Sequence, residues 1–215
     1  MTEIIKNFLP RKIRNLLWSF RNSISKNYNL NKWRKNDCPY PPPHQFKQLV
    51  IQQYQKKFNY HIFIETGTLD GDMIEAQRNI FLKLYSIELN KVFWQRAVVR
   101  FKKYNHIQIL QGDSSIVLNK ITNKLSEPAI FWLDGHYSAG DTAKGDKECP
   151  IFEEIDAIFS FNQFNHIIII DDANSFDGKG DYPTIDELTL YIKKYNIKYE
   201  LNINSGVLIY ELATQ

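Results

Sequence analysis

Acidic side chains stand at the ends of five apolar, β-favouring segments of this 215-residue chain. They are Glu65, Glu88, Asp113, Asp134 and the pair Asp171-Asp172. In an open sheet of parallel strands, ligands bind outside the carboxyl ends of the strands. A single acid there commonly caps the next helix, and Asp113 is well placed to cap one that starts at Ser114. Five in succession predict carboxylates that point into one shared crevice.

The segment 61–72 indicates what that crevice binds. A buried strand ends at Glu65, Gly67 and Gly71 follow in a turn, and a helical segment begins after them. Glycines let a ligand approach the backbone, and a helix N-terminus adds free N–H groups. A carboxylate at the strand end repels a pyrophosphate but favours hydroxyls and cations. These properties fit S-adenosylmethionine (SAM), whose sulfonium and ammonium groups are both positive.

The end of the next strand supports a nucleoside ligand. Glu88 follows Glu65 by 23 residues, where such sites keep an acid that binds both ribose hydroxyls. The G-x-G-x-x-G fingerprint of dinucleotide-binding proteins is absent, because the spacing here is Gly67-x-x-x-Gly71. The simpler interpretation of Glu88 is a surface residue in a turn.

A second group of acids predicts a cation site. Asp134, Asp171 and Asp172 end two strands that we expect to be neighbours, and converging carboxylates repel one another unless a cation lies between them. Oxygen-only ligands suit Mg²⁺, Mn²⁺ or Ca²⁺ rather than zinc. Asn174 is a candidate for an additional amide oxygen. In the alternative interpretation Asp171 or Asp172 only caps a turn.

His136, two residues after Asp134, is the candidate general base, because an unperturbed histidine has a pKa near 6.5. A hydrogen bond to the metal shell and a solvent-facing position are the alternatives for His136. Tyr137 and Lys144 are the next candidates for the base. Polar residues and glycines over 138–145 are typical of a mobile lid.

The elements that must position these residues alternate between strand and helix, which predicts a doubly wound, mostly parallel sheet. The expected strands are 61–65, 84–88, 107–110, 129–133 and 166–170, followed by a terminal antiparallel hairpin at 198–202 and 206–210. The expected helices are 45–57, 72–81, 91–104, 114–125, 150–160 and 184–195. His61, His106 and His166 fall at strand starts, so we expect structural roles for them.

Residues 1–37 are expected to form a basic N-terminal extension, and residues 38–215 the catalytic domain. Residues 1–35 carry nine Lys and Arg against Glu3 alone, with apolar residues at helical spacing. Such an amphipathic helix lies on a membrane surface or a partner, or packs on its own domain or a dimer mate. The prolines of 38–44 form a stiff linker, and His44 either contacts ligand or belongs to a spacer.

Composition excludes several classes of protein. The net charge of +3 is too small to indicate a nucleic-acid partner. No apolar run approaches the roughly 20 residues that span a bilayer, and no signal peptide is evident. The two distant cysteines, Cys38 and Cys149, fit reduced thiols, so we expect a cytoplasmic protein.

The motifs E-T-G-T-L-D-G, S-I-E-L, Q-G-D-S and W-L-D-G-H-Y-S occur in order along the chain and resemble those of class I SAM-dependent methyltransferases. L-D-G-H-Y-S followed by I-I-D-D-A is similar to macrocin-type sugar O-methyltransferases, and the resemblance covers about residues 40–212. Leu69 stands where the superfamily often has a glycine.

The resemblance implies a role for each matching position. Glu65, Gly67, Thr68 and Gly71 would line the methionine and ribose side of SAM, Glu88 would hold the ribose hydroxyls, and Asp113 with Ser114 would lie at the adenine. Asp134, Asp171 and Asp172 would bind a divalent metal that chelates substrate hydroxyls, with Asp134 and His136 as catalytic residues. The implied acceptor is a hydroxylated small molecule such as a sugar.

Three other functions remain open from the sequence. A nucleotide-sugar glycosyltransferase would use Asp171-Asp172 to hold Mg²⁺ on a diphosphate. A non-catalytic module would keep the fold and act through its N-terminal helix on a membrane or partner. A metal-dependent hydrolase is the third, although no nucleophile motif is visible.

Overall fold

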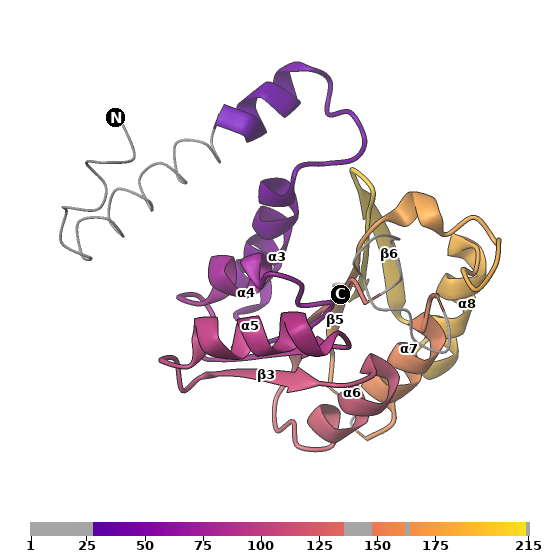
Figure 1. Cartoon of the computed structure of the whole chain (residues 1–215). Helices are drawn as coiled ribbons and strands as arrows, with labels where there is room; N and C mark the ends of the chain where they lie inside the picture. The colour runs from indigo at the N-terminus through magenta and orange to yellow at the C-terminus, as the bar shows by residue number, and fades with distance from the viewer. Residues whose placement is uncertain (1–27, 136–147, 162–163, 214–215) are drawn as a thin grey trace. The chain divides into compact units, whose positions relative to one another are not determined.

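The computed structural model describes residues 28–135, 148–161 and 164–213 (Figure 1). The chain divides into two compact units, Met1–Lys47 and Gln48–Gln215, and the division falls inside helix α3 (His44–Phe58). In the first unit, residues 28–35 are helical, and the indole N–H of Trp33 donates to the Pro39 carbonyl at 2.7 Å. Most of the basic extension lies outside the described residues.

The second unit is built on a seven-stranded sheet in the order β3-β2-β1-β4-β5-β7-β6. The first five strands run parallel, whereas β7 is antiparallel to both β5 and β6. This confirms the predicted doubly wound sheet with a C-terminal hairpin. The strands are β1 (Ile62–Thr66), β2 (Lys83–Glu88), β3 (Ile107–Gln111), β4 (Ala129–Leu133), β5 (Ile167–Ile170), β6 (Tyr199–Asn204) and β7 (Val207–Leu212).

Helices lie on both faces of the sheet (Figure 1). The helices after β1 and β2 are α4 (Asp72–Gln77) and α5 (Lys91–Phe101); those after β3, β4 and β5 are α6 (Ser114–Thr122), α7 (Ile151–Phe159) and α8 (Ile185–Tyr195). Alternate residues of a strand serve opposite faces. Ile62 and Ile64 of β1 accordingly join the apolar cluster formed with α6, α7 and α8, while Phe63 packs on Phe81, with ring centroids 5.2 Å apart.

The register of the sheet brings the predicted site residues to one edge. Thr66 at the end of β1 lies opposite Ile87 of β2 and Leu133 of β4, and Leu133 lies opposite Ile170 of β5. The residues that follow these strands therefore leave the sheet side by side. The chain continues from β1 and from β4 toward opposite sides of the sheet, so this edge includes the topological switch point where ligands bind in such folds.

Helices α4, α5 and α6 end three or four residues earlier than expected, and the difference is largest for α4. The pattern predicts a helix over 72–81, but α4 ends at Gln77, and the amides of Ile80 and Phe81 both donate to the Gln77 carbonyl in a tight turn. The turn releases Phe81 to bury its ring, which is only 3 % exposed, against β1. Tertiary packing thus overrides the local helical pattern.

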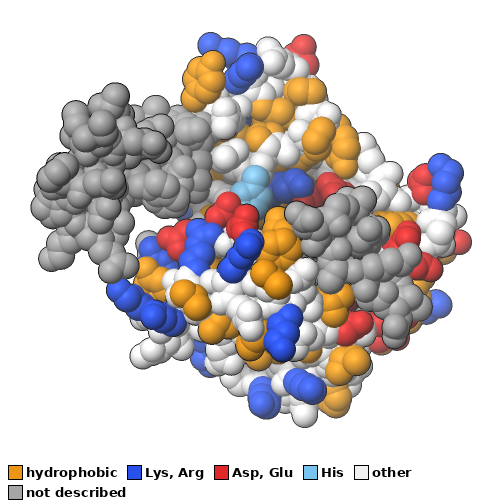
Figure 2. All heavy atoms as spheres, viewed as in Figure 1, with side chains coloured by type: hydrophobic (Ala, Val, Ile, Leu, Met, Phe, Trp, Pro, Cys, Tyr) orange, Lys and Arg blue, Asp and Glu red, His pale blue; other side chains and the backbone are white. Residues whose placement is uncertain are grey.

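Polar features outside the site are ordinary. Cys38 and Cys149 are both free thiols, and basic and acidic side chains are interspersed on the face drawn in Figure 2. Within the described part of the chain, none of the helices has the length and apolar character needed to cross a membrane.

The three histidines at the strand starts make structural contacts. His61 lies 3.3 Å from the Glu127 carboxylate, and His106 Nε2 lies 2.9 Å from the Arg78 carbonyl. His166 is fully buried, and its Nδ1 accepts the Ala129 N–H at 3.1 Å. Burial lowers the pKa of His166 from 6.5 to about 4, so the ring is neutral in the folded protein at neutral pH.

This neutral histidine predicts a loss of stability in mild acid. Between pH 6.5 and 4 the unfolded chain binds a proton that the folded chain does not, so the free energy of unfolding falls as the pH falls through that window. At pH 5 His166 should contribute a loss of about 2 kcal/mol relative to neutral pH. Urea unfolding of wild type and of His166→Asn between pH 4 and 7 measures this contribution to the free energy of unfolding. The asparagine keeps an acceptor for the Ala129 N–H. Parallel pH profiles for the two proteins would contradict it.

Candidate functional site

A glycine turn joins β1 to α4 and contacts the end of β4. The Gly67 amide donates to the Ile87 carbonyl at 3.0 Å, and its φ of +83° is one that L side chains rarely adopt. A Cβ atom at Gly67 would lie 2.2 Å from the carbonyl oxygen of Asp134. Only glycine therefore allows this turn to lie against the Asp134 backbone.

Glu65 is a buried carboxyl next to the turn. Its Oε1 accepts a hydrogen bond from the Ser86 hydroxyl at 2.6 Å, and Ser86 is in turn paired with the Thr68 hydroxyl. Oε2 is buried and has no hydrogen-bond partner among the described residues. Burial raises the pKa of Glu65 well above 4.5, and the charges of Asp134 and Glu88 raise it further. A cation or hydrogen-bond donor at this position would relieve the cost of ionising it.

Glu88 ties the turn to the end of β2. Its Oε2 accepts the Leu69 N–H and its Oε1 accepts the Asn90 N–H, both at 2.8 Å. The side chain is 7 % exposed, which excludes the interpretation as a surface residue. Each carboxylate oxygen can accept more than one hydrogen bond, so Glu88 keeps capacity for ligand hydroxyls.

The other predicted cofactor residues lie at the ends of nearby elements. Thr68 and Ser114 are buried, and Gly71 precedes α4 with φ +77°, where a Cβ would clash with the Phe101 ring. Asp113 caps α6: its Oδ1 accepts the Ser115 N–H at 2.9 Å and the Ser115 hydroxyl at 2.6 Å. The capping role anticipated for Asp113 is confirmed. The adenine contact of Asp113 and Ser114 stays a prediction.

The three predicted metal-binding acids do converge. One carboxylate oxygen from each of Asp134, Asp171 and Asp172 lies within 4.8 Å of the others. Backbone contacts hold them there: the Asp134 amide donates to Thr66, the Asp171 amide donates to the Leu133 carbonyl, and the Asp172 amide donates to Asp171 Oδ1. Asp171 is only 2 % exposed, and Asp172 has φ +51°. Three close, partly buried carboxylates suit an oxygen-seeking divalent cation.

Several predicted catalytic residues cannot be placed. His136, Tyr137, Lys144 and the expected lid 138–145 lie outside the described residues. Asn174 is described and is an exposed residue of the short 3-10 helix Ala173–Ser175.

Sequence reasoning missed two polar residues of this site. Ser86 is fully buried in β2, and its hydroxyl donates to Glu65. In the sequence it could have been recognised as a hydroxyl residue within an otherwise apolar strand. Glu154 of α7 is 2 % exposed, and its Oε1 would lie 3.0 Å from a Cβ at Gly135, directly after Asp134. In the sequence, Glu154 could have been recognised as an acid on the apolar face of the predicted helix 150–160.

No protein-family model matches the chain, and a comparison with curated proteins gives no match. Among solved structures, the chain is similar to an O-methyltransferase from Bacillus cereus in complex with SAH, at 13 % identity and TM-score 0.58 over 87 % of this chain and 90 % of that one. It is also similar to TomG of Streptomyces achromogenes in complex with SAM, at 11 % identity and TM-score 0.55 over 88 % of this chain and 89 % of that one. A third similar structure is SAH-bound PaMTH1 of Podospora anserina, at 13 % identity and TM-score 0.55 over 96 % of this chain and 99 % of that one. The chain has the fold of these methyltransferases.

The contact between Gly67 and Asp134 predicts that a single added methyl group at Gly67 strongly lowers the stability of the protein. Gly67→Ala should destabilise the protein by clearly more than the 1–2 kcal/mol that a left-handed backbone alone costs, because the new Cβ meets backbone atoms. Gly180→Ala is the matched control, since Gly180 has φ +60° and a Cβ there meets nothing within 4 Å. Urea unfolding compares the two variants. Equal costs would show that the contact is unimportant.

Proposed function

We propose that this chain is a SAM-dependent O-methyltransferase, assisted by a divalent cation, that methylates a hydroxyl group of a small molecule. The main observation that supports this proposal is that the Gly67 turn lies against the Asp134 backbone. In this proposal the cofactor lies on the Gly67 side of that contact and the cluster of three acids on the Asp134 side, as a transfer from a cofactor to a metal-bound hydroxyl requires. The resemblance to macrocin-type enzymes makes a sugar the proposed acceptor.

The acids of the crevice support SAM as the cofactor. Glu65 and Glu88 suit the positive charges and ribose hydroxyls of SAM, while Gly67, Thr68 and Gly71 leave room at the backbone. We assign Asp113 and Ser114 to the adenine side. Two of the similar structures are described with SAH and one with SAM. The residue types at this edge and the likeness of fold therefore support SAM, which would supply the electrophilic methyl group.

The acid cluster suits Mg²⁺, Mn²⁺ or Ca²⁺, held by Asp134, Asp171 and Asp172. A cation there would lower the pKa of an acceptor hydroxyl. We propose that His136, two residues after Asp134, accepts the hydroxyl proton, and that Asp134 orients the acceptor oxygen. The Asp134 amide donates to the Thr66 hydroxyl at 3.2 Å, which fixes where Asp134 follows β4.

The rival functions fit the crevice less well. A glycosyltransferase would place a diphosphate near Asp171 and Asp172, but the carboxyl groups of Glu65 and Glu88 lie at the same edge of the sheet, where each would repel a diphosphate when ionised. The non-catalytic module depends on residues 1–35, most of which the structure does not describe. A hydrolase would still lack a visible nucleophile motif.

Glu88 provides a test of SAM binding. Glu88→Gln should weaken SAM binding by about 1.5 kcal/mol, or roughly tenfold, because a charged acceptor for the ribose hydroxyls becomes neutral. Calorimetric titration with SAM measures the effect. Glu127→Gln is the control, since Glu127 pairs with His61 at the opposite edge of the sheet. Unchanged affinity in Glu88→Gln would remove Glu88 from the site.

Asp171 tests the cation separately. Asp171→Asn should strongly reduce Mn²⁺ binding and abolish metal-dependent turnover but spare SAM binding, because the amide keeps the acceptor for the Asp172 N–H and loses the charge. Electron paramagnetic resonance of added Mn²⁺ reports the bound fraction. Asp177→Asn, an exposed acid paired with Lys179, is the control. Full Mn²⁺ binding by Asp171→Asn would refute the metal site.

A further inference from the structure

We propose that a pocket between α7, α8 and the loop 178–183 binds a negatively charged, ring-containing part of the methyl acceptor. In this proposal the ring lies against Phe152 and Tyr191, and a carboxylate or phosphate of the acceptor pairs with Lys194. The inference rests on the proposed function and adds a substrate class to it. Among the described residues, none of the groups used here belongs to the SAM crevice or the acid cluster.

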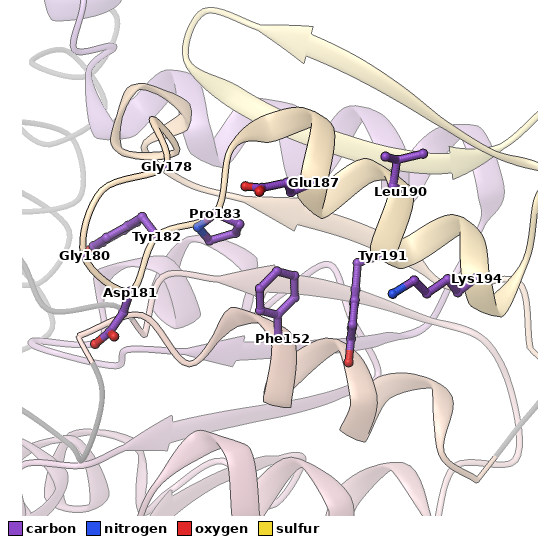
Figure 3. Close-up of a pocket in the computed structure, with 10 residues that line it drawn as sticks. All are labelled: Phe152, Gly178, Gly180, Asp181, Tyr182, Pro183, Glu187, Leu190, Tyr191 and Lys194. Atoms are coloured by element: carbon purple, nitrogen blue, oxygen red, sulfur yellow. The ribbon is translucent and has the colours of Figure 1, made fainter.

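The walls of this pocket suit a ring. The pocket has a volume of about 540 Å³, which is ample for a ring with one substituent (Figure 3). Phe152 projects from α7 and Tyr191 from α8, with their ring centroids 4.5 Å apart. Pro183 adds a further apolar surface from the loop. Aromatic side chains in a concave site provide contact area for a flat or saccharide ring.

The charges of the pocket favour an anion. Lys194 lies with its ammonium 4.8 Å from the Tyr191 ring centroid and makes no salt bridge within the described part of the chain. The two acids of the pocket keep their negative charge but point their oxygens at protein donors: Asp181 accepts the Glu148 N–H at 2.8 Å, and Glu187 accepts the Thr184 N–H and hydroxyl, both at 2.8 Å. Glu187 also lies seven residues, or two helical turns, before Lys194, so an anionic group would bind at the Lys194 end of the pocket.

The loop that lines the pocket starts at the acid cluster. It runs from Asp172 to Thr184, and a backbone bridge between Asp177 and Thr184 closes it. Phe176 is buried and packs on Tyr182 of the pocket wall, with ring centroids 5.7 Å apart. The pKa of Tyr182 is raised to about 12, chiefly by burial and then by nearby acids that include Asp172 and Asp134. Tyr182 thus belongs to the part of the pocket wall nearest the acid cluster, and in this proposal one acceptor extends from the pocket to the cluster.

The test compares two probes that differ in one charge. Phenyl β-D-glucuronide and neutral phenyl β-D-glucoside are titrated into the full-length protein by saturation-transfer NMR. Wild type should bind the glucuronide several-fold more tightly, because a charge-assisted contact to Lys194 is available. Lys194→Gln should remove this preference, and Lys193→Gln, one residue away and outside the pocket lining, should keep it.

A second variant tests the ring contact. Tyr191→Leu should weaken both probes to a similar degree, because it removes the aromatic wall and leaves Lys194 in place. Circular dichroism checks that each variant folds.

Three results would overturn the inference: no binding of either probe, equal binding of both by wild type, or a preference that survives in Lys194→Gln. Titration of the same samples with SAH distinguishes a failure of the acceptor pocket from a failure of the proposed function. If SAH binds and the probe result fails, only the acceptor pocket is wrong. If SAH does not bind, the proposed function fails.

Discussion

The close approach of the Gly67 turn to the backbone of Asp134 is the constraint on which the rest of the site depends. It joins the end of β1 to the end of β4, the two strands between which the order of the sheet reverses. The turn can lie against Asp134 only because Gly67 has no side chain, and Glu88 holds the same turn by accepting the Leu69 N–H. The same contact fixes where Asp134 leaves the sheet.

Negative charge is the second organising feature of this edge. The charges of Asp134 and Glu88 both raise the pKa of Glu65, and the carboxylates of Asp171 and Asp172 lie beside that of Asp134. Carboxylates gathered in this way destabilise a folded protein unless cations or donors compensate them. A sulfonium cofactor and a divalent ion, the two groups in the proposed function, would both do so.

Much of this arrangement was predictable from the sequence, and the failures have physical causes. The buried strands were recognisable as apolar runs that end in acids, and parallel pairing then brought Asp134, Asp171 and Asp172 together. The early end of α4 was not predictable, because it depends on the packing of Phe81 against β1. The roles of Ser86 and Glu154 were missed because a single buried polar residue carries no pattern. The pocket beside α7 and α8 is formed by residues distant in the chain, whose meeting no spacing rule predicts.

The central claim is that the edge of the sheet at the ends of β1 and β2 binds an adenosyl amino acid. Calorimetric titration of the full-length protein with SAH and SAM, with and without Mg²⁺, tests it most directly, with UDP-glucose as the competing ligand. The account predicts saturable, roughly micromolar binding of SAH and SAM and no binding of UDP-glucose. Binding of UDP-glucose without SAH or SAM would contradict it and favour a glycosyltransferase.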